Sequence, residues 1–162
     1  PKFTSAFLHG KGIGAMVVPY RRWPAAAGAF HAMLRRAERL KAGEAHKLGV
    51  VDELVADGGD LIGRAVARVH ALAGKPRAKL DGAVAIAPFE PMEPKAANGQ
   101  MLSREALGVL EQGVLEAAGS PSFAAALEAG YRAFGRVACI AAAREGIGAF
   151  LERRKPDFGR TG

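Results

Sequence analysis

The chain has 162 residues, of which 49% are hydrophobic and 24% are charged, and its formal net charge is +7. This length suffices for one domain with its own core, and the composition is typical of a globular protein rather than a disordered one. No run of 18 apolar residues occurs, which excludes a membrane-spanning helix of the usual length. The positive charge favours an anionic partner but does not choose among nucleic acid, a membrane surface and a phosphorylated small molecule.

The chain begins Pro1-Lys-Phe-Thr, without an initiator Met and without the apolar segment of a secretory signal. Such a start is typical of a piece cut from a longer protein. The single cysteine, Cys139, excludes an intrachain disulfide and fits a reducing, cytoplasmic compartment. It lies in the apolar run V-A-C-I-A-A-A, so we expect a buried structural thiol rather than a nucleophile.

The N-terminal residues predict an extended piece followed by a turn. Phe3-Thr-Ser-Ala-Phe-Leu is the extended piece, and Gly10-Lys-Gly-Ile-Gly, with three glycines in five residues, predicts a loop. This loop matches neither the phosphate-binding motif G-x-x-x-x-G-K nor the dinucleotide motif G-x-G-x-x-G. We therefore interpret Gly10–Gly14 as a turn.

A first helix is predicted from Trp23-Pro24 to about Leu40, because proline is tolerated in the first helical turn. Its apolar positions recur at helical spacing: Phe30, Met33, Leu34 and Ala37. His31 lies one residue off this stripe, so we expect a partly exposed histidine rather than a ligand.

Two further helices are expected in the next forty residues. A short one spans about Gly43–Leu48 and ends at Gly49, which can adopt a left-handed conformation. Val50–Val55 is rich in β-branched residues and predicts a small strand or an extended link. After a turn at Asp57-Gly58-Gly59, Asp60 can cap a helix that runs to Gly74. Its apolar face consists of Leu61, Ala65, Val66, Val69 and Leu72.

Residues 75–99 contain four prolines and predict an irregular loop. Ser103 is a candidate cap for the following helix, and Ser120-Pro121 is a second start signal. The helix that Ser120 begins is expected to run to about Ala143. The sequence as a whole thus predicts a mainly α protein with five or six helices and little strand.

The final stretch, Arg144–Phe158, predicts an amphipathic, basic helix that ends at Lys155-Pro156. Ile147, Phe150 and Leu151 form its apolar stripe. Gly146 and Gly148 each cost about 1 kcal/mol of helix stability relative to alanine. They indicate either close packing or a mobile terminal helix.

No catalytic or metal-binding constellation follows from spacing alone. The four histidines, His9, His31, His46 and His70, are not paired at metal-ligand spacing. No Ser, Cys or Thr has an activating context, and the pair Asp52-Glu53 is typical of a solvated turn. Nucleic acid is disfavoured as a partner because the aromatic residues lie on predicted apolar helix faces rather than between basic residues.

Three stretches, in order, resemble one known family. Arg39–Val55 contains G-E-A-H-K-L-G-V-V-D-E-L-V and resembles A-x-E-A-x-x-x-G-L-V-x-x-V of the crotonase superfamily, the enoyl-CoA hydratases and isomerases. Glu145–Phe158 resembles that family's ending, E-G-x-x-A-F-x-E-K-R-x-P-x-F. Upstream, the stretch from Phe3 through Arg22-Trp-Pro to Ala27-Gly28 is similar to the residues that lead to R-L-P-x-x-V-G. The resemblance covers most of the chain except about residues 82–119.

The resemblance implies the C-terminal helical part of an α/β crotonase-like fold. Residues 1–40 would then be the end of the crotonase core with a linking helix, and residues 41–162 a helical region for oligomerisation and for covering CoA. Family members bind an acyl-CoA thioester and stabilise its enolate with two backbone N–H groups. The G-G-G-x-E stretch that carries this oxyanion hole is absent, and Gly12–Val18 lacks the carboxylate of many members. We therefore expect the chain alone to be inactive, and catalytic residues are not assigned.

Two residues carry over from the family as CoA contacts. Phe150 matches the aromatic residue near the adenine, and Arg153 matches the basic residue near a phosphate. From the residues alone, a core phenylalanine and a solvated arginine are equally good readings. The family also implies an acyl-CoA substrate of fatty acid metabolism, no permanently bound cofactor, and a homotrimer or hexamer. A hydrolase, a non-catalytic relative, or a helical interaction or regulatory module without chemistry are the alternatives.

Overall fold

The computed structural model describes residues 11–56 and 59–159. Contacts divide them into two compact units: the residues up to Arg39 group with those from Leu80 onward, and Leu40–Lys79 form the second unit. The division predicted from the family, 1–40 and 41–162, concerns the parts of a crotonase-like protein and stays a prediction.

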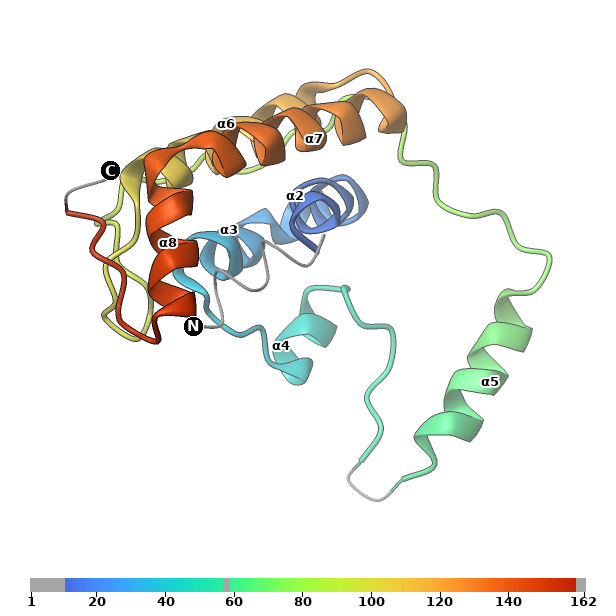
Figure 1. Cartoon of the computed structure of the whole chain (residues 1–162). Coiled ribbons are helices and arrows are strands. Elements are labelled where there is room, and N and C mark those ends of the chain that lie inside the picture. Colours follow the sequence, from blue (N-terminus) through green and yellow to red (C-terminus); the bar gives the residue numbers. More distant parts are fainter. Residues whose placement is uncertain (1–10, 57–58, 160–162) are drawn as a thin grey trace. The chain divides into compact units, whose positions relative to one another are not determined.

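Helices dominate both units (Figure 1). In the first unit they are α2 (Lys11–Arg22), the 3-10 helix η1 (Pro24–Ala26), α3 (Ala27–Arg36), α6 (Arg104–Gly119), α7 (Phe123–Cys139) and α8 (Ala141–Leu151). The second unit holds α4 (Ala42–Lys47) and α5 (Leu61–Leu72). The described residues contain no strand, only an isolated antiparallel bridge between Lys95 and Met101. The mainly α prediction is confirmed, and its assignment to a crotonase-like fold stays a prediction.

The helical pair α6 and α7 makes the most extensive packing contact of the first unit. Small residues line it, which lets the two backbones approach closely: a Cβ placed on Gly113 would lie 2.6 Å from the Cβ of Ala133. Ser103 caps α6 by accepting a hydrogen bond from the Ala106 amide at 3.0 Å, as predicted. The cap of α7 is Ser122, which accepts from Ala125, and not Ser120, whose position ends α6.

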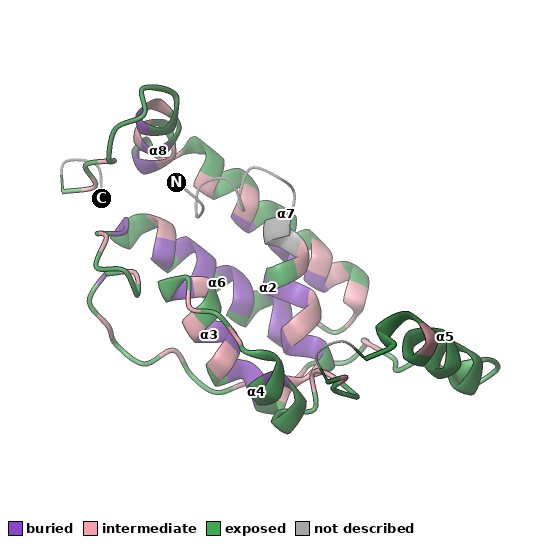
Figure 2. Ribbon diagram, turned by 90° about the horizontal axis from the view of Figure 1, so that it is seen from below, coloured by how far each residue is buried: buried purple, intermediate pink, exposed green. Residues whose placement is uncertain are grey.

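Helix α2 packs on α6 and α7 and supplies the largest buried side chains of the core. Figure 2 shows the buried residues along the facing sides of α2, α3, α6 and α7. Met16, Val17 and Tyr20 are almost fully inaccessible. The predicted turn at Gly10–Gly14 is therefore wrong from Lys11 onward, because burial of this face outweighs the helix cost of Gly12, Gly14 and Pro19. Gly10 and the predicted extended piece lie outside the described residues.

Three predicted boundaries of helices are also wrong. Helix α3 ends at Arg36 rather than near Leu40, because Ala37 adopts a left-handed conformation with φ 55°. One helix does not run to Ala143, since Ile140 is extended and separates α7 from α8. Helix α8 ends at Leu151, four residues before Lys155-Pro156.

In the second unit the predicted helix end and helix cap are confirmed, whereas the exposure of its longer helix was not predicted. Gly49 has φ +70°, as predicted for a left-handed helix end, and Asp60 caps α5 by accepting from the Gly63 amide at 2.8 Å. Val50–Val55 is not a strand: its first three residues form bends, and the amides of Val50 and Val51 donate to the Ala45 carbonyl. None of the residues of α5 is buried, although the sequence predicts an apolar face. Of the predicted turn, Asp57 and Gly58 lie outside the described residues.

The proline-rich segment is irregular, as predicted, and one buried arginine ties its first residues to α6. Arg21 is only 5% exposed and donates hydrogen bonds to backbone oxygens of Leu80 at 2.6 Å and of Ala117 at 2.7 Å. It also donates to the oxygens of Gly82 and Ser120. Because these carbonyls surround the C-terminal end of α6, they favour a cation there.

Candidate functional site

The two predicted site residues lie at the C-terminal end of α8, and both are exposed. Phe150 is 52% exposed, and Arg153 follows the helix by two residues. The apolar stripe predicted for this helix is wrong, because Ile147, Phe150 and Leu151 are exposed. Its buried side instead consists of Ala142, Gly146 and Ala149, whose small size lets α8 pack against α6 and α7.

The end of α8 brings Arg153 back toward Phe150. The Arg153 amide donates to the Phe150 carbonyl at 3.2 Å, and the Arg154 amide donates to the Ala149 carbonyl at 2.9 Å. These two bonds form a Schellman motif, in which the residue after the cap takes a left-handed conformation. Arg153 is that residue, with φ 55°. The backbone thus places Arg153 one turn from Phe150.

Arg154 and two glutamates form a closed cluster of charges beside this turn. Glu145 accepts from Arg154 Nη1 at 2.5 Å and Nη2 at 2.9 Å, and Glu152 accepts from Arg154 Nε at 2.5 Å. The same bonds, first to Glu145 and then to Glu152, raise the pKa of the Arg154 guanidinium above its ordinary value. Glu145 also accepts from the Asp157 amide at 2.7 Å, which fixes the chain after the helix. The cluster is structural.

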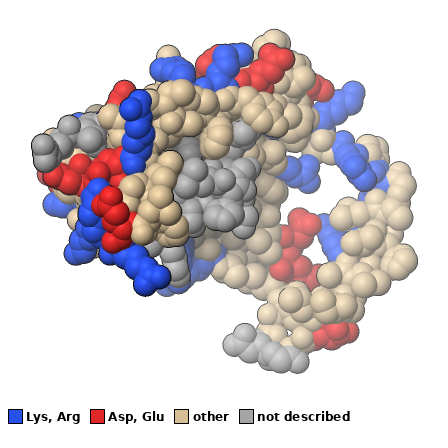
Figure 3. Space-filling model, in the orientation of Figure 1, with Lys and Arg blue, Asp and Glu red and all other residues tan. Residues whose placement is uncertain are grey.

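Arg153 is left with its charge available. Within the part of the chain that the structure describes, it makes no ion pair, because the neighbouring glutamates bind Arg154. Figure 3 shows basic and acidic side chains intermixed over this end of the molecule. The arrangement can hold a flat aromatic group against Phe150 and an anion at Arg153.

Two residues singled out from the sequence lie in other environments than expected. Cys139, the last residue of α7, is exposed and not the buried thiol predicted, because the buried side of α7 ends at Ala133. His31 is buried at 7% exposure instead of partly exposed. Its Nδ1 lies 3.1 Å from the Tyr20 hydroxyl and its Nε2 lies 2.9 Å from the Ala87 carbonyl oxygen. A carbonyl only accepts, so Nε2 donates to it and Nδ1 accepts from Tyr20.

No group of three or more His, Cys, Asp or Glu side chains at metal-binding distance occurs among the described residues. The same residues include no helix that is long and apolar enough to cross a membrane. Neither finding assigns a chemical step to the chain.

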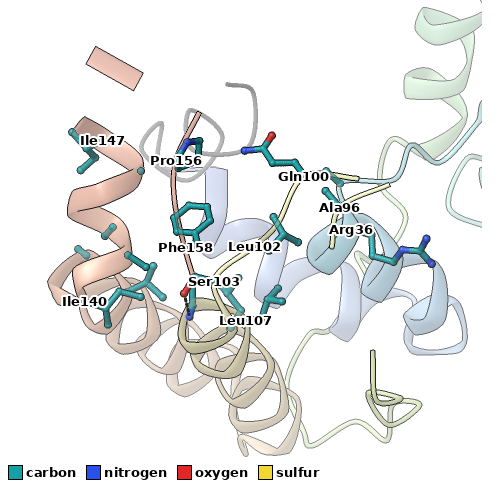
Figure 4. Close-up of a pocket in the computed structure, with 18 of the residues that line it drawn as sticks. Arg36, Ala96, Gln100, Leu102, Ser103, Leu107, Ile140, Ile147, Pro156 and Phe158 are labelled. Carbon is teal, nitrogen blue, oxygen red and sulfur yellow. Dashed lines mark hydrogen bonds between the residues drawn. The ribbon is translucent and has the colours of Figure 1, made fainter. Parts of the chain in front are cut away.

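A cavity of about 620 Å³ lies in the first unit, and the sequence analysis did not predict it. Side chains from α6, α7 and α8 form its walls, together with residues 96–103 and the segment after α8. In Figure 4, Ile140 and Ile147 lie at one end, Phe158 and Leu102 in the middle, and Arg36 at the other end. Because these segments are far apart in the chain, no local pattern could have predicted the cavity.

Comparisons with protein-family models, with curated proteins and with solved structures found no match to this chain. The crotonase resemblance and the roles of Phe150 and Arg153 that come from it therefore stay predictions.

Proposed function

We propose that the chain is the C-terminal portion of an enoyl-CoA hydratase/isomerase-like protein of the crotonase superfamily, which acts on an acyl-CoA thioester. The oxyanion hole belongs to residues upstream of this chain, and this portion contributes contacts to CoA and to neighbouring subunits of a homotrimer or hexamer. Three motifs in the family's order and the mainly helical architecture support the proposal.

The observation that carries the proposal is an exposed aromatic ring one turn from a guanidinium that has no ion pair among the described residues. CoA ends in an adenosine that bears phosphates, so it offers a flat ring and an anion close together. Phe150, at 52% exposure, can stack on the adenine, and Arg153 can bind a phosphate oxygen. A core phenylalanine, the alternative reading of Phe150, is not compatible with this exposure.

Isothermal titration with CoA and with adenosine 3′,5′-bisphosphate tests the site. We expect both ligands to bind the full chain, and Phe150→Ala to weaken each by about tenfold or more, because stacking of a base is worth roughly 1–3 kcal/mol. Arg153→Ala removes a charge-assisted hydrogen bond and has an effect of similar size.

Two matched variants control for surface apolarity and net charge. Leu151→Ala removes a neighbouring side chain that is 74% exposed, and Arg144→Gln removes one positive charge from the same helix. Neither variant should change the affinity by more than twofold. If all four variants bind CoA alike, or if the chain does not retain CoA, the proposal is wrong. Turnover of crotonyl-CoA by this chain would contradict the placement of the catalytic machinery upstream.

A helical interaction module is the second candidate, and one observation favours it. The apolar residues of α5 are exposed, including Ile62 at 73% and Val69 at 68%. Self-association in sedimentation experiments, lost in Val69→Asp and accompanied by no CoA affinity, would support this candidate over the first.

A further inference from the structure

The cavity of the first unit carries an inference of its own, because its lining has a definite chemical character. Its volume, about 620 Å³, lies within the range of small-molecule sites. Most of the lining is aliphatic or aromatic, with Leu107, Leu110, Phe134, Val137, Ile140 and Ile147 as the large contributors. An apolar chain placed among them would lose its contact with water at little polar cost.

The charge in the lining has one sign. Among the described residues that line the cavity, Arg36 and Arg39 are the charged ones; Glu38, which pairs with Arg36, does not line it. Two of the three neutral polar side chains are engaged locally: Ser103 accepts from the Ala106 amide, and Asn98 accepts from the Gln100 amide at 3.1 Å. The electrostatic preference of the cavity mouth is therefore set by the two arginines and favours an anion.

Both arginines can receive a ligand. Arg36 pairs with Glu38 at 3.1 Å, but the two side chains are 51% and 38% exposed, and such a solvated pair contributes at most about 1 kcal/mol. Arg39 is exposed and has no ion pair within the described ranges. Arg36 lies at the end of the cavity opposite Ile140 and Ile147, and in this view its guanidinium points away from the other lining residues, so its exposed side chain must turn to meet a ligand (Figure 4). An elongated ligand would thus have its charged and apolar ends at opposite ends of the cavity.

We propose that this cavity binds a single acyl chain with an anionic head group. The chain lies among Leu107, Phe134, Ile140 and Ile147, and the head group pairs with Arg36 and Arg39. Phe150 and Arg153 are not among the described lining residues, so this site is separate from the proposed CoA contact and does not depend on it. A free fatty carboxylate and the phosphate of a lysophospholipid share this chemistry.

Titration with amphiphiles of equal chain length tests the choice of head group. We expect dodecanoate to bind the full chain at least tenfold more tightly than dodecyltrimethylammonium or dodecanol, and more tightly than hexanoate. A further titration with dodecanoyl lysophosphatidate compares the affinities for a phosphate and a carboxylate head group. Equal affinity for the cationic and anionic amphiphiles, or no binding of any of them, would overturn the proposal.

Variants distinguish the contribution of the arginines to binding from that of the apolar lining. The double variant Arg36→Gln/Arg39→Gln should weaken dodecanoate at least tenfold and leave the weaker binding of dodecanol unchanged, while Arg144→Gln should change neither. Ala143→Phe fills the cavity and should abolish binding of every amphiphile; Ala106→Leu is a milder filling that should weaken all of them. Circular dichroism checks the folding of each variant. Dodecanoate binding that survives both filled variants, when these are folded, places the ligand elsewhere and refutes the proposal.

A chain-labelled probe locates the ligand without any substitution. A fatty carboxylate with a nitroxide near its methyl end should broaden the methyl signals of Ile140 and Ile147 more than that of Leu115, a residue of the same unit that does not line the cavity. Adenosine 3′,5′-bisphosphate should not displace this probe. Loss of adenosine bisphosphate binding with probe binding intact refutes only the proposed function, whereas the reverse result refutes only the acyl site.

Discussion

At the scale of single residues, Arg153 combines a backbone cost with an available charge. A left-handed conformation costs a residue with a side chain about 1 kcal/mol relative to glycine, which is the usual residue at this position of the Schellman motif. We therefore expect Arg153→Gly to raise the free energy of unfolding by about 1 kcal/mol and to weaken CoA binding by about tenfold. Urea unfolding and calorimetric titration measure the two effects.

Arg153→Ala is the matched control, since it removes the same guanidinium but keeps a Cβ in the left-handed conformation. It should lose CoA affinity without the gain in stability. A stability loss in Arg153→Gly would mean that the side chain supports the fold and would contradict the division of roles between Arg153 and Arg154.

Tyr20 predicts how stability responds to alkaline pH. Burial raises the pKa of its hydroxyl above the ordinary value of about 10, an effect opposed by the charge of Arg35. Since the unfolded state releases this proton first, the stability contributed by neutral Tyr20 is present below about pH 10 and is lost as the pH rises above it. Unfolding free energies should fall more steeply above pH 10 in the native chain than in Tyr20→Phe.

At neutral pH, Tyr20→Phe should itself cost about 1–2 kcal/mol, because His31 Nδ1 is then buried without a donor. The exposed Tyr131 provides the control: Tyr131→Phe should leave both the stability and its pH dependence unchanged. An identical alkaline slope in Tyr20→Phe and the native chain would contradict the assignment.

At the scale of elements, the packing of α6 on α7 depends on the absence of one side chain. The Cβ of an alanine at position 113 would approach the Cβ of Ala133 to 2.6 Å, so the helices must separate to admit it. We expect Gly113→Ala to lower the free energy of unfolding by about 1–3 kcal/mol. Gly108→Ala, on the exposed side of α6 with nothing within 4 Å, should instead raise it by up to about 1 kcal/mol. Thermal or urea unfolding of the two variants should give shifts of opposite sign.

The elements show which structural features a sequence can predict. Ser103, Gly49 and Asp60 were assigned correctly because capping depends on a few neighbouring residues. Helix α2 was missed because its stability comes from burial of Met16 and Tyr20 against distant helices, which no local propensity records. The buried side of α8, formed by Ala142, Gly146 and Ala149, was not identified for the same reason.

At the scale of the whole molecule, the net charge overstates how many positive side chains are accessible to an anionic partner. Two of the arginines that contribute to the net charge of +7 are buried: Arg21 donates to backbone carbonyl groups, and Arg35 pairs with Glu111 at 2.7 Å. The candidate site was named from motif resemblance, and only the structure shows that Phe150 is exposed and that Glu145 and Glu152 are occupied by Arg154. The cavity of the first unit could not be predicted, because its walls come from distant segments.

The two units should also differ strongly in stability. Helices α6 and α7 together contain eleven buried residues, whereas α5 has none. An isolated helix of 12 residues is marginal in water, and the ion pair between Arg68 and Asp52, at 3.2 Å and exposed, adds little. Native-state hydrogen exchange should therefore show amides of α5 exchanging at least 100-fold faster than those at the centre of α6. Equal protection in the two helices would show that the apolar side of α5 is buried against a partner in solution. Measuring the exchange at several protein concentrations would then identify the partner, since protection that falls on dilution indicates a second copy of the chain.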